Sequence, residues 1–292
     1  MRLFAKLLTL PLLFLAENNY ADSQFNHCDP AKNTDRIVVA GGSITEILYF
    51  LDKPHNIVAT DITSNYPKEA RNFPSVGYVR DLSAEGLLSI KPTLILAEHD
   101  AGPPEVLSQL SRLNLDIRVI PEQYNATGII DKVNCVAEIM GMSAEDTRLA
   151  TAELNQIIQS LDKHTNNTDL KVGVLLSTSG GLMIAGVETS GNGVLAMVGL
   201  ENAFNEVNGW KPVTKESMLK VNPDVLLTTQ RALDSVGGLK GLTQNAAIGL
   251  TQAGKTNQIY AFDGMALLGF GPRTLEAAYQ LLEISEQVTA NH

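Results

Sequence analysis

A repeated pattern constrains the fold of this chain more than any other feature. The segment Ser83–Leu96 is echoed by Thr214–Leu227, and Pro92 of the first copy matches Pro223 of the second. Each copy predicts a short helix that begins after a hydroxyl cap, ends before the proline and is followed by a buried strand. Two copies this far apart predict two similar α/β lobes rather than a solenoid. Ligands commonly bind in clefts between such lobes.

Strand and helix patterns alternate on both sides of one long amphipathic stretch. Short apolar runs predict strands at 36–40, 57–60, 93–97, 117–120, 171–176, 182–185, 225–229 and 259–262. This alternation is typical of parallel sheets with helices on both faces. We therefore expect an α/β fold of two Rossmann-like lobes with parallel sheets, residues 33–142 and 169–292, around a ligand cleft. Residues 143–168 are expected to form one long linking helix and a loop.

The start of the chain resembles a secretion signal. Basic Arg2 and Lys6 precede the apolar run Leu7–Ala16, which is too short to span a bilayer. We expect residues 1–21 to form a signal peptide and the protein to reach the periplasm, although an uncleaved anchor or a buried first helix would also fit. The net charge of −10 argues against binding to nucleic acid, and we expect no membrane insertion after signal cleavage.

Two cysteines, Cys28 and Cys135, are far apart in the sequence. An oxidising compartment would allow them to form one disulfide, which would tie the mature N-terminus to the first lobe. The alternative is two unpaired thiols, one of them buried. Their separation does not fit a zinc site.

Signatures of enzymatic chemistry are missing from the sequence. Gly41 and Gly42 follow a strand and precede a helix, but they lack the dinucleotide and P-loop patterns and predict only a tight turn. No nucleophile elbow or metalloprotease motif occurs. The best candidate for a binding site is the loop Thr63–Lys68 at the carboxyl edge of the first sheet, where open α/β folds place ligands. Its Tyr66 would otherwise simply pack over the loop.

Several motifs make the whole mature chain resemble the haem-transport periplasmic binding proteins. These belong to the ABC-transporter solute-binding proteins with a rigid inter-lobe helix, a group that also carries siderophores and cobalamin. The segments that carry the resemblance are Arg36–Ala40, Gly41–Glu46, Thr63–Pro67, Gly77–Arg80 with the run to Leu96, Gly209–Pro212, Gly237–Gly238 and Leu267–Thr274.

The resemblance implies that Tyr66 is the axial ligand of ferric haem iron. A phenolate is a hard anionic donor that suits ferric iron, and Lys68 or Arg231 could supply a cation that favours it. Arg231 would otherwise be a solvated loop residue. The remaining candidates are cations for the haem propionates (Lys68, Arg71, Arg80) and apolar contacts (Tyr78, Met183, Met265, Leu268, Phe270). The two methionines would otherwise be core residues, and Arg273 is expected to pair with a carboxylate that fixes the last helix.

The matched acidic residues of the repeat, Glu85 and Glu216, are implied to dock on arginines of a membrane permease. Alternatively, each stabilises its helix start by about 0.3–1 kcal/mol. Some members of the family that the chain resembles present a histidine from the second lobe to the haem. The comparable turn here, Ser177–Gly181, has no histidine, so we expect a single five-coordinate haem. We thus expect a monomer that catalyses no reaction and passes haem to an inner-membrane ABC permease with its ATPase. A ferric siderophore or cobalamin carrier of the same fold, or an exported enzyme, are the alternatives.

Overall fold

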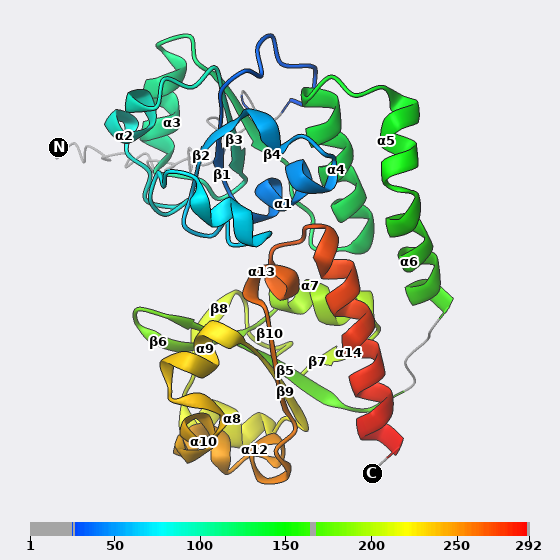
Figure 1. Ribbon diagram of the computed structural model, residues 1–292. Coiled ribbons are helices and arrows are strands. Elements are labelled where there is room, and N and C mark those ends of the chain that lie inside the picture. Colours follow the sequence, from blue (N-terminus) through cyan, green and yellow to red (C-terminus); the bar gives the residue numbers. More distant parts are fainter. Residues whose placement is uncertain (1–24, 26, 164–167, 291–292) are drawn as a thin grey trace, which may run out of the picture.

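Two α/β lobes lie one above the other and are joined along one side by helices (Figure 1). The computed structural model describes residue 25 and residues 27–163 and 168–290. The expected signal peptide, residues 1–21, lies outside the described residues. Among the helices that the structure describes, none has the length and hydropathy needed to cross a bilayer.

The N-terminal lobe contains a four-stranded parallel sheet in the order β2-β1-β3-β4. The strands are β1 (Ile37–Ala40), β2 (Ile57–Thr60), β3 (Leu94–Glu98) and β4 (Asp116–Ile120). Alternate residues of β1 enter two different core clusters, one on each face of the sheet. The helices are α1 (Gly42–Phe50), α2 (Ala84–Ser89), α3 (Pro104–Ser111), α4 (Ala126–Ile139) and the 3-10 turns η1 (Pro54–Asn56) and η2 (Lys68–Asn72). The predicted parallel sheet is confirmed here.

The C-terminal lobe contains a mixed six-stranded sheet in the order β10-β9-β5-β6-β8, with β7 paired to β5. The strands are β5 (Lys171–Thr178), β6 (Gly181–Ala185), β7 (Glu201–Asn202), β8 (Trp210–Pro212), β9 (Val225–Thr229) and β10 (Ile259–Phe262). The prediction of a purely parallel sheet is wrong for this lobe, since β6 is antiparallel to both β5 and β8. The tight turn at Ser179–Gly180 explains the antiparallel pairing of β5 with β6, because so short a connection can join only antiparallel strands.

Helices of the C-terminal lobe surround this sheet (Figure 1). They are α7 (Ser190–Met197), α8 (Lys215–Val221), α9 (Gln230–Ser235), α10 (Gly238–Gln244), α11 (Ala246–Gly249), α12 (Gln252–Thr256), α13 (Gly264–Leu268) and α14 (Pro272–Ala290). The last helix, α14, runs beside the linker and reaches up to the N-terminal lobe (Figure 1).

The expected linking helix is divided at Thr151 into α5 (Ala144–Ala150) and α6 (Ala152–Lys163). Helical backbone bonds continue through the division, since the Thr151 amide donates to Thr147 (2.9 Å) and the Asn155 amide donates to Thr151 (3.0 Å). The Thr151 hydroxyl also donates to the Thr147 carbonyl, a bond that often bends helices. Residues 164–167, in the expected loop, lie outside the described residues.

The repeat has the structure that its sequence predicts. The Ser83 hydroxyl accepts from the third helical amide of α2, and Thr214 does the same for α8. Both helices end before the prolines, and β3 and β9 follow at equivalent places in the two sheets. The local caps and breaks therefore determine the two halves in the same way.

The two cysteines form a disulfide, Cys28–Cys135, with 4.9 Å between the Cα atoms. The bond ties the segment before β1 to α4, so the expected disulfide is confirmed and the alternative of two free thiols is wrong.

Candidate functional site

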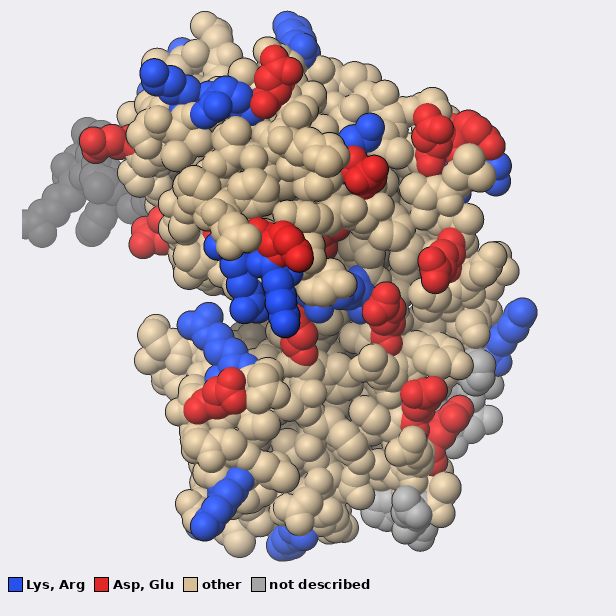
Figure 2. Space-filling view, in the orientation of Figure 1, with Lys and Arg blue, Asp and Glu red and all other residues tan. Residues whose placement is uncertain are grey.

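A hollow lies between the two lobes, and lysine and arginine side chains gather around its mouth (Figure 2). The carboxyl ends of β1 and β2 lead into the loops on the N-terminal side, and β9 and β10 lead into α9 and α13 on the C-terminal side. Open α/β sheets place their ligands at these strand ends.

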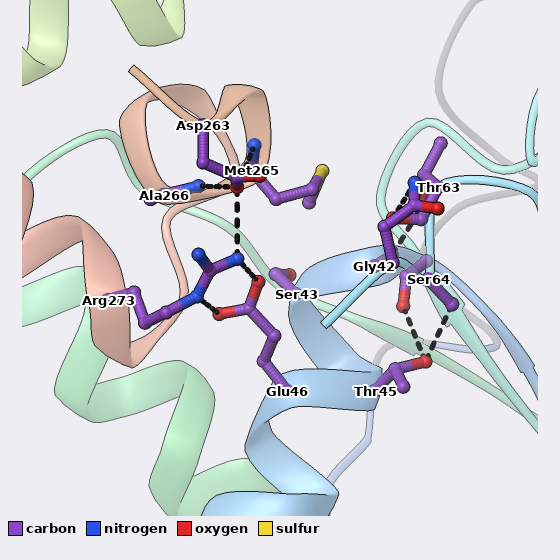
Figure 3. A network of polar contacts seen from close by, with 12 residues as sticks. Gly42, Ser43, Thr45, Glu46, Thr63, Ser64, Asp263, Met265, Ala266 and Arg273 are labelled. Atoms are coloured by element: carbon purple, nitrogen blue, oxygen red, sulfur yellow. Dashed lines mark hydrogen bonds and ion pairs between the residues drawn. The ribbon is translucent and has the colours of Figure 1, made fainter. Parts of the chain in front are cut away.

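Buried Asp61 holds the loop that carries Tyr66. Its carboxylate accepts from the Thr63 amide (3.0 Å) and from the hydroxyls of Thr63 and Ser64. The Ser64 hydroxyl also bonds the Thr45 hydroxyl (2.7 Å), and the Gly42 amide donates to the Thr63 hydroxyl (2.9 Å). Burial raises the pKa of Asp61, and the hydrogen bonds from Thr63 and Ser64 oppose that effect. The loop is thereby fastened to the start of α1 (Figure 3).

Tyr66 extends from this fastened loop with 46% of its surface exposed. Within the described part of the chain, its hydroxyl makes no hydrogen bond. The face of its ring is covered, because the guanidinium carbon of Arg273 lies 3.8 Å from the ring centroid. This contact has cation–π geometry. The tyrosine thus combines a supported ring with a free oxygen.

Arg273 joins the two lobes. From the start of α14 it donates to both carboxylate oxygens of Glu46 on α1, and to Asp263, which caps α13 (3.0 Å; Figure 3). Burial raises the pKa of Glu46, and the hydrogen bonds from Arg273 oppose this shift. The expected carboxylate partner of Arg273 is present. Nothing in the sequence pattern places the same arginine against Tyr66.

The predicted apolar contacts divide into exposed and buried residues. Tyr78 is exposed, Met183 on β6 and Leu268 on α13 are half-buried, and Met265 on α13 reaches towards Gly42 of the N-terminal lobe. The expectation for Phe270 is wrong, because its side chain is fully buried and packs against the Tyr124 ring at 5.1 Å between centroids. Phe270 contributes to the contact between the lobes, which leaves none of its surface for a ligand.

The four predicted cations differ in whether their charged groups are already bound to protein partners. Lys68 and Arg231 are exposed at the first turns of η2 and α9. The Arg71 guanidinium donates to the Asn65 carbonyl (3.1 Å) and so supports the Tyr66 loop. Arg80 is paired with Asp100 and with the Tyr78 hydroxyl. Lys68 and Arg231 are therefore the freer charges for an anionic ligand.

Ile62 is a surface residue that the sequence reasoning missed. It is 53% exposed in the loop before Tyr66, and its amide donates to the Gly77 carbonyl (2.9 Å). This bond places the Tyr66 loop beside the turn that carries Tyr78. An isoleucine in a loop does not by itself indicate an exposed side chain, so the folded structure was needed to identify this residue.

A buried ionic cluster lies at the ends of β3 and β4 and was also missed. Lys132 on α4 donates to Glu122 (2.7 Å) and contacts the Gly269 carbonyl of the other lobe (3.4 Å), while Glu122 also pairs with His99 (2.6 Å). Glu98 accepts from the Ser43 hydroxyl (2.8 Å). Ligand atoms of Glu98, His99 and Asp100 lie within 4.8 Å of one another, but each of these side chains already has a protein partner.

Glu85 and Glu216 are exposed in the first turns of α2 and α8. These helices belong to different lobes, so the molecule presents one such carboxylate on each (Figure 1). Their helix-start positions agree with a role in helix stabilisation and leave them accessible to a partner.

Two α/β lobes joined by a helical linker, with polar loops and free cations around the hollow between them, define a solute-binding protein. The chain belongs to the periplasmic binding protein family, whose model matches residues 37–266.

Similar proteins include both structures and sequences. The structure of the periplasmic haem-binding protein RhuT from Roseiflexus sp. RS-1 is 32% identical and covers 88% of this chain and 99% of its own, with a TM-score of 0.81. The ABC transporter substrate-binding lipoprotein YvrC of Bacillus subtilis (strain 168) is 24% identical over 86% of this chain and 80% of its own length. The vitamin B12-binding protein of Yersinia pestis (strain Pestoides F) is 25% identical over 71% of this chain and 74% of its own length. All three are described as binding proteins.

Proposed function

We propose that this chain binds ferric haem in the hollow between its lobes, with the Tyr66 phenolate as axial ligand to iron. The observation that carries the proposal is the state of Tyr66, which has a firmly held loop, a ring covered by a cation and a hydroxyl that no described residue hydrogen-bonds. Phenolate is a hard anionic donor, and tyrosine is one of the known protein ligands of haem iron. Likeness to haem-binding proteins over nearly the whole chain supports this choice of ligand.

The surroundings of Tyr66 suit the other parts of a haem. Ile62 and Tyr78 offer exposed apolar surface beside the tyrosine, and Met265 approaches from the opposite lobe. The exposed cations Lys68 and Arg231 are available for the propionates. A flat apolar ligand with two carboxylates fits this combination of charges and apolar surface.

We further propose that the protein acts in the periplasm as a monomer and delivers haem to an inner-membrane ABC permease with its ATPase. The family and the ABC-transporter relative support this role. Exposed Glu85 and Glu216, one on each lobe, would contact permease arginines and so orient the docked protein.

Titration with hemin tests the ligand assignment. The unaltered protein is expected to give a tyrosinate-type absorption spectrum with one iron per chain, and Tyr66→Phe is expected to lose the tyrosinate band. Tyr279→Phe is the matched control, because Tyr279 is also exposed but lies on α14 facing the linker. A tyrosinate spectrum that survives in Tyr66→Phe would refute the assignment.

Cobalamin is the second candidate ligand, because one relative is described as a vitamin B12-binding protein. Titration with cyanocobalamin, followed by hemin competition, distinguishes the two. Tight cobalamin binding that Tyr66→Phe leaves unchanged would favour this candidate over haem.

A further inference from the structure

We propose that Arg273 is the positioning residue for Tyr66: its guanidinium supports one face of the ring and supplies the positive charge that the phenolate needs when it binds ferric iron. This inference rests on the proposed haem ligation by Tyr66. It assigns a binding role to a side chain that also joins α14 to α1 and to the cap of α13.

The orientation of the guanidinium is fixed by its carboxylate partners. Nε and Nη2 of Arg273 donate to the two oxygens of Glu46, and Nη2 also donates to Asp263. A two-bond contact with one carboxylate fixes the plane of the group as well as its position. The guanidinium carbon so held lies over the Tyr66 ring, 3.8 Å from the ring centroid. The side chain is 16% exposed, so little water competes for this contact.

The backbone under Arg273 is held equally firmly. Pro272 is the buried first residue of α14, and Gly271 lies so close to α1 that a Cβ added to it would be 3.3 Å from the Ser43 Cβ. The arginine therefore starts from a fixed point on the second lobe and ends against a loop of the first. Correct assembly of both lobes is needed to bring it under Tyr66.

The arrangement leaves the reacting atom free. Arg273 touches the ring face, and among the described residues nothing hydrogen-bonds the Tyr66 hydroxyl, so the oxygen is available to iron. Ligation releases the phenol proton to solvent as the Fe–O bond forms. A nearby positive charge favours the resulting anion. The other charged groups around this contact are Asp61 beneath the loop, Lys68 and Arg71 after it, and Glu46, Asp263 and Glu276 around the arginine.

The test measures the pH dependence of the hemin complex in Arg273→Met. The tyrosinate band of the unaltered protein disappears on acidification as the phenol regains its proton. Without Arg273, the midpoint of this change is expected to rise by about one pH unit, the lower end of the effect of an opposite charge in contact. Hemin affinity near neutral pH is expected to fall about tenfold, the equivalent of that shift.

A second pair of variants protects the test against damage to the fold. Arg273→Met leaves the buried Glu46 carboxylate without its partner, so the same measurements compare Glu46→Gln with Glu46→Gln/Arg273→Met. In this background no buried charge is left unpaired. Arg148→Met is the surface control, since Arg148 is exposed on α5 and pairs with the exposed Glu145. The pH midpoint and the hemin affinity of this control are expected to match those of the unaltered protein.

Each outcome decides the question. A midpoint that is higher in Arg273→Met than in the unaltered protein, and higher in Glu46→Gln/Arg273→Met than in Glu46→Gln, supports the role of Arg273. A midpoint and affinity that do not change, or a lower melting temperature with an unchanged midpoint, would show that Arg273 is only a structural link. If the unaltered protein gives no Tyr66-dependent spectrum with hemin, the proposed function itself fails, and this inference fails with it.

Discussion

Replacing Lys132 by methionine tests whether the buried ionic cluster holds the lobes together. Lys132 is 1% exposed, pairs with Glu122 at 2.7 Å and contacts Gly269 of the opposite lobe. Methionine fills similar space but removes the buried cation from Glu122, which keeps its pair with the partly exposed His99, and from nearby Glu98. Removing one partner of a buried pair destabilises a protein by about 3–5 kcal/mol. For a chain of this size, that corresponds to a melting temperature lower by about 10 °C.

The pH dependence of this loss has a definite sign. Burial acts to raise the pKa of Glu122, but hydrogen bonds from His99 and Lys132 outweigh it, and the pKa is lowered. The charged carboxylate therefore stabilises the unaltered protein fully at pH values above 4.5, the ordinary pKa of the group. That stability is lost as the pH falls through the lowered pKa of the folded protein. In Lys132→Met the carboxylates are more readily protonated, and protonation removes the negative charge that Lys132 no longer offsets. The loss of stability in Lys132→Met relative to the unaltered protein should be largest near neutral pH and smaller near pH 5.

Thermal and urea unfolding at both pH values provide the assay. Lys220→Met is the matched control, because Lys220 is exposed and pairs with the exposed Glu206 at 3.7 Å. Exposed pairs of this kind contribute little, so its melting temperature should stay close to that of the unaltered protein. An unchanged melting temperature in Lys132→Met near neutral pH, or a deficit that grows on acidification, would refute the reasoning.

Two further predictions concern the disulfide and the proposed docking surface. The Cys28→Ala/Cys135→Ala variant should lose about 2–5 kcal/mol of unfolding free energy, because the bond closes a loop of 107 residues. Urea unfolding with and without reductant measures this, and the reductant should affect only the unaltered protein. Glu85→Gln/Glu216→Gln should leave hemin binding unchanged but slow haem uptake through the permease reconstituted in vesicles. Normal uptake would exclude a docking role.

Features fixed by neighbouring residues could be predicted from the sequence. The hydroxyl caps at Ser83 and Thr214, and the prolines that end each repeat helix, act over one or two turns of chain. The apolar runs after them formed strands β3 and β9 for the same local reason. The loop that carries Tyr66 could be selected as a candidate binding site because it follows a strand, where the fold places ligands, whereas the role of Tyr66 itself came from the family resemblance.

Features that depend on contacts between the lobes required the tertiary structure. Nothing local shows that Arg273 meets Glu46, 227 residues away, or that its guanidinium lies over the Tyr66 ring. Phe270 likewise has the apolar character of a ligand contact, and only the packing against Tyr124 shows that it is buried. The sequence determined the two similar lobes and the tyrosine loop, because caps, turns and apolar runs act locally. The partners of each charged or aromatic side chain were decided by how the two lobes pack, since packing brings together residues that are far apart in the chain.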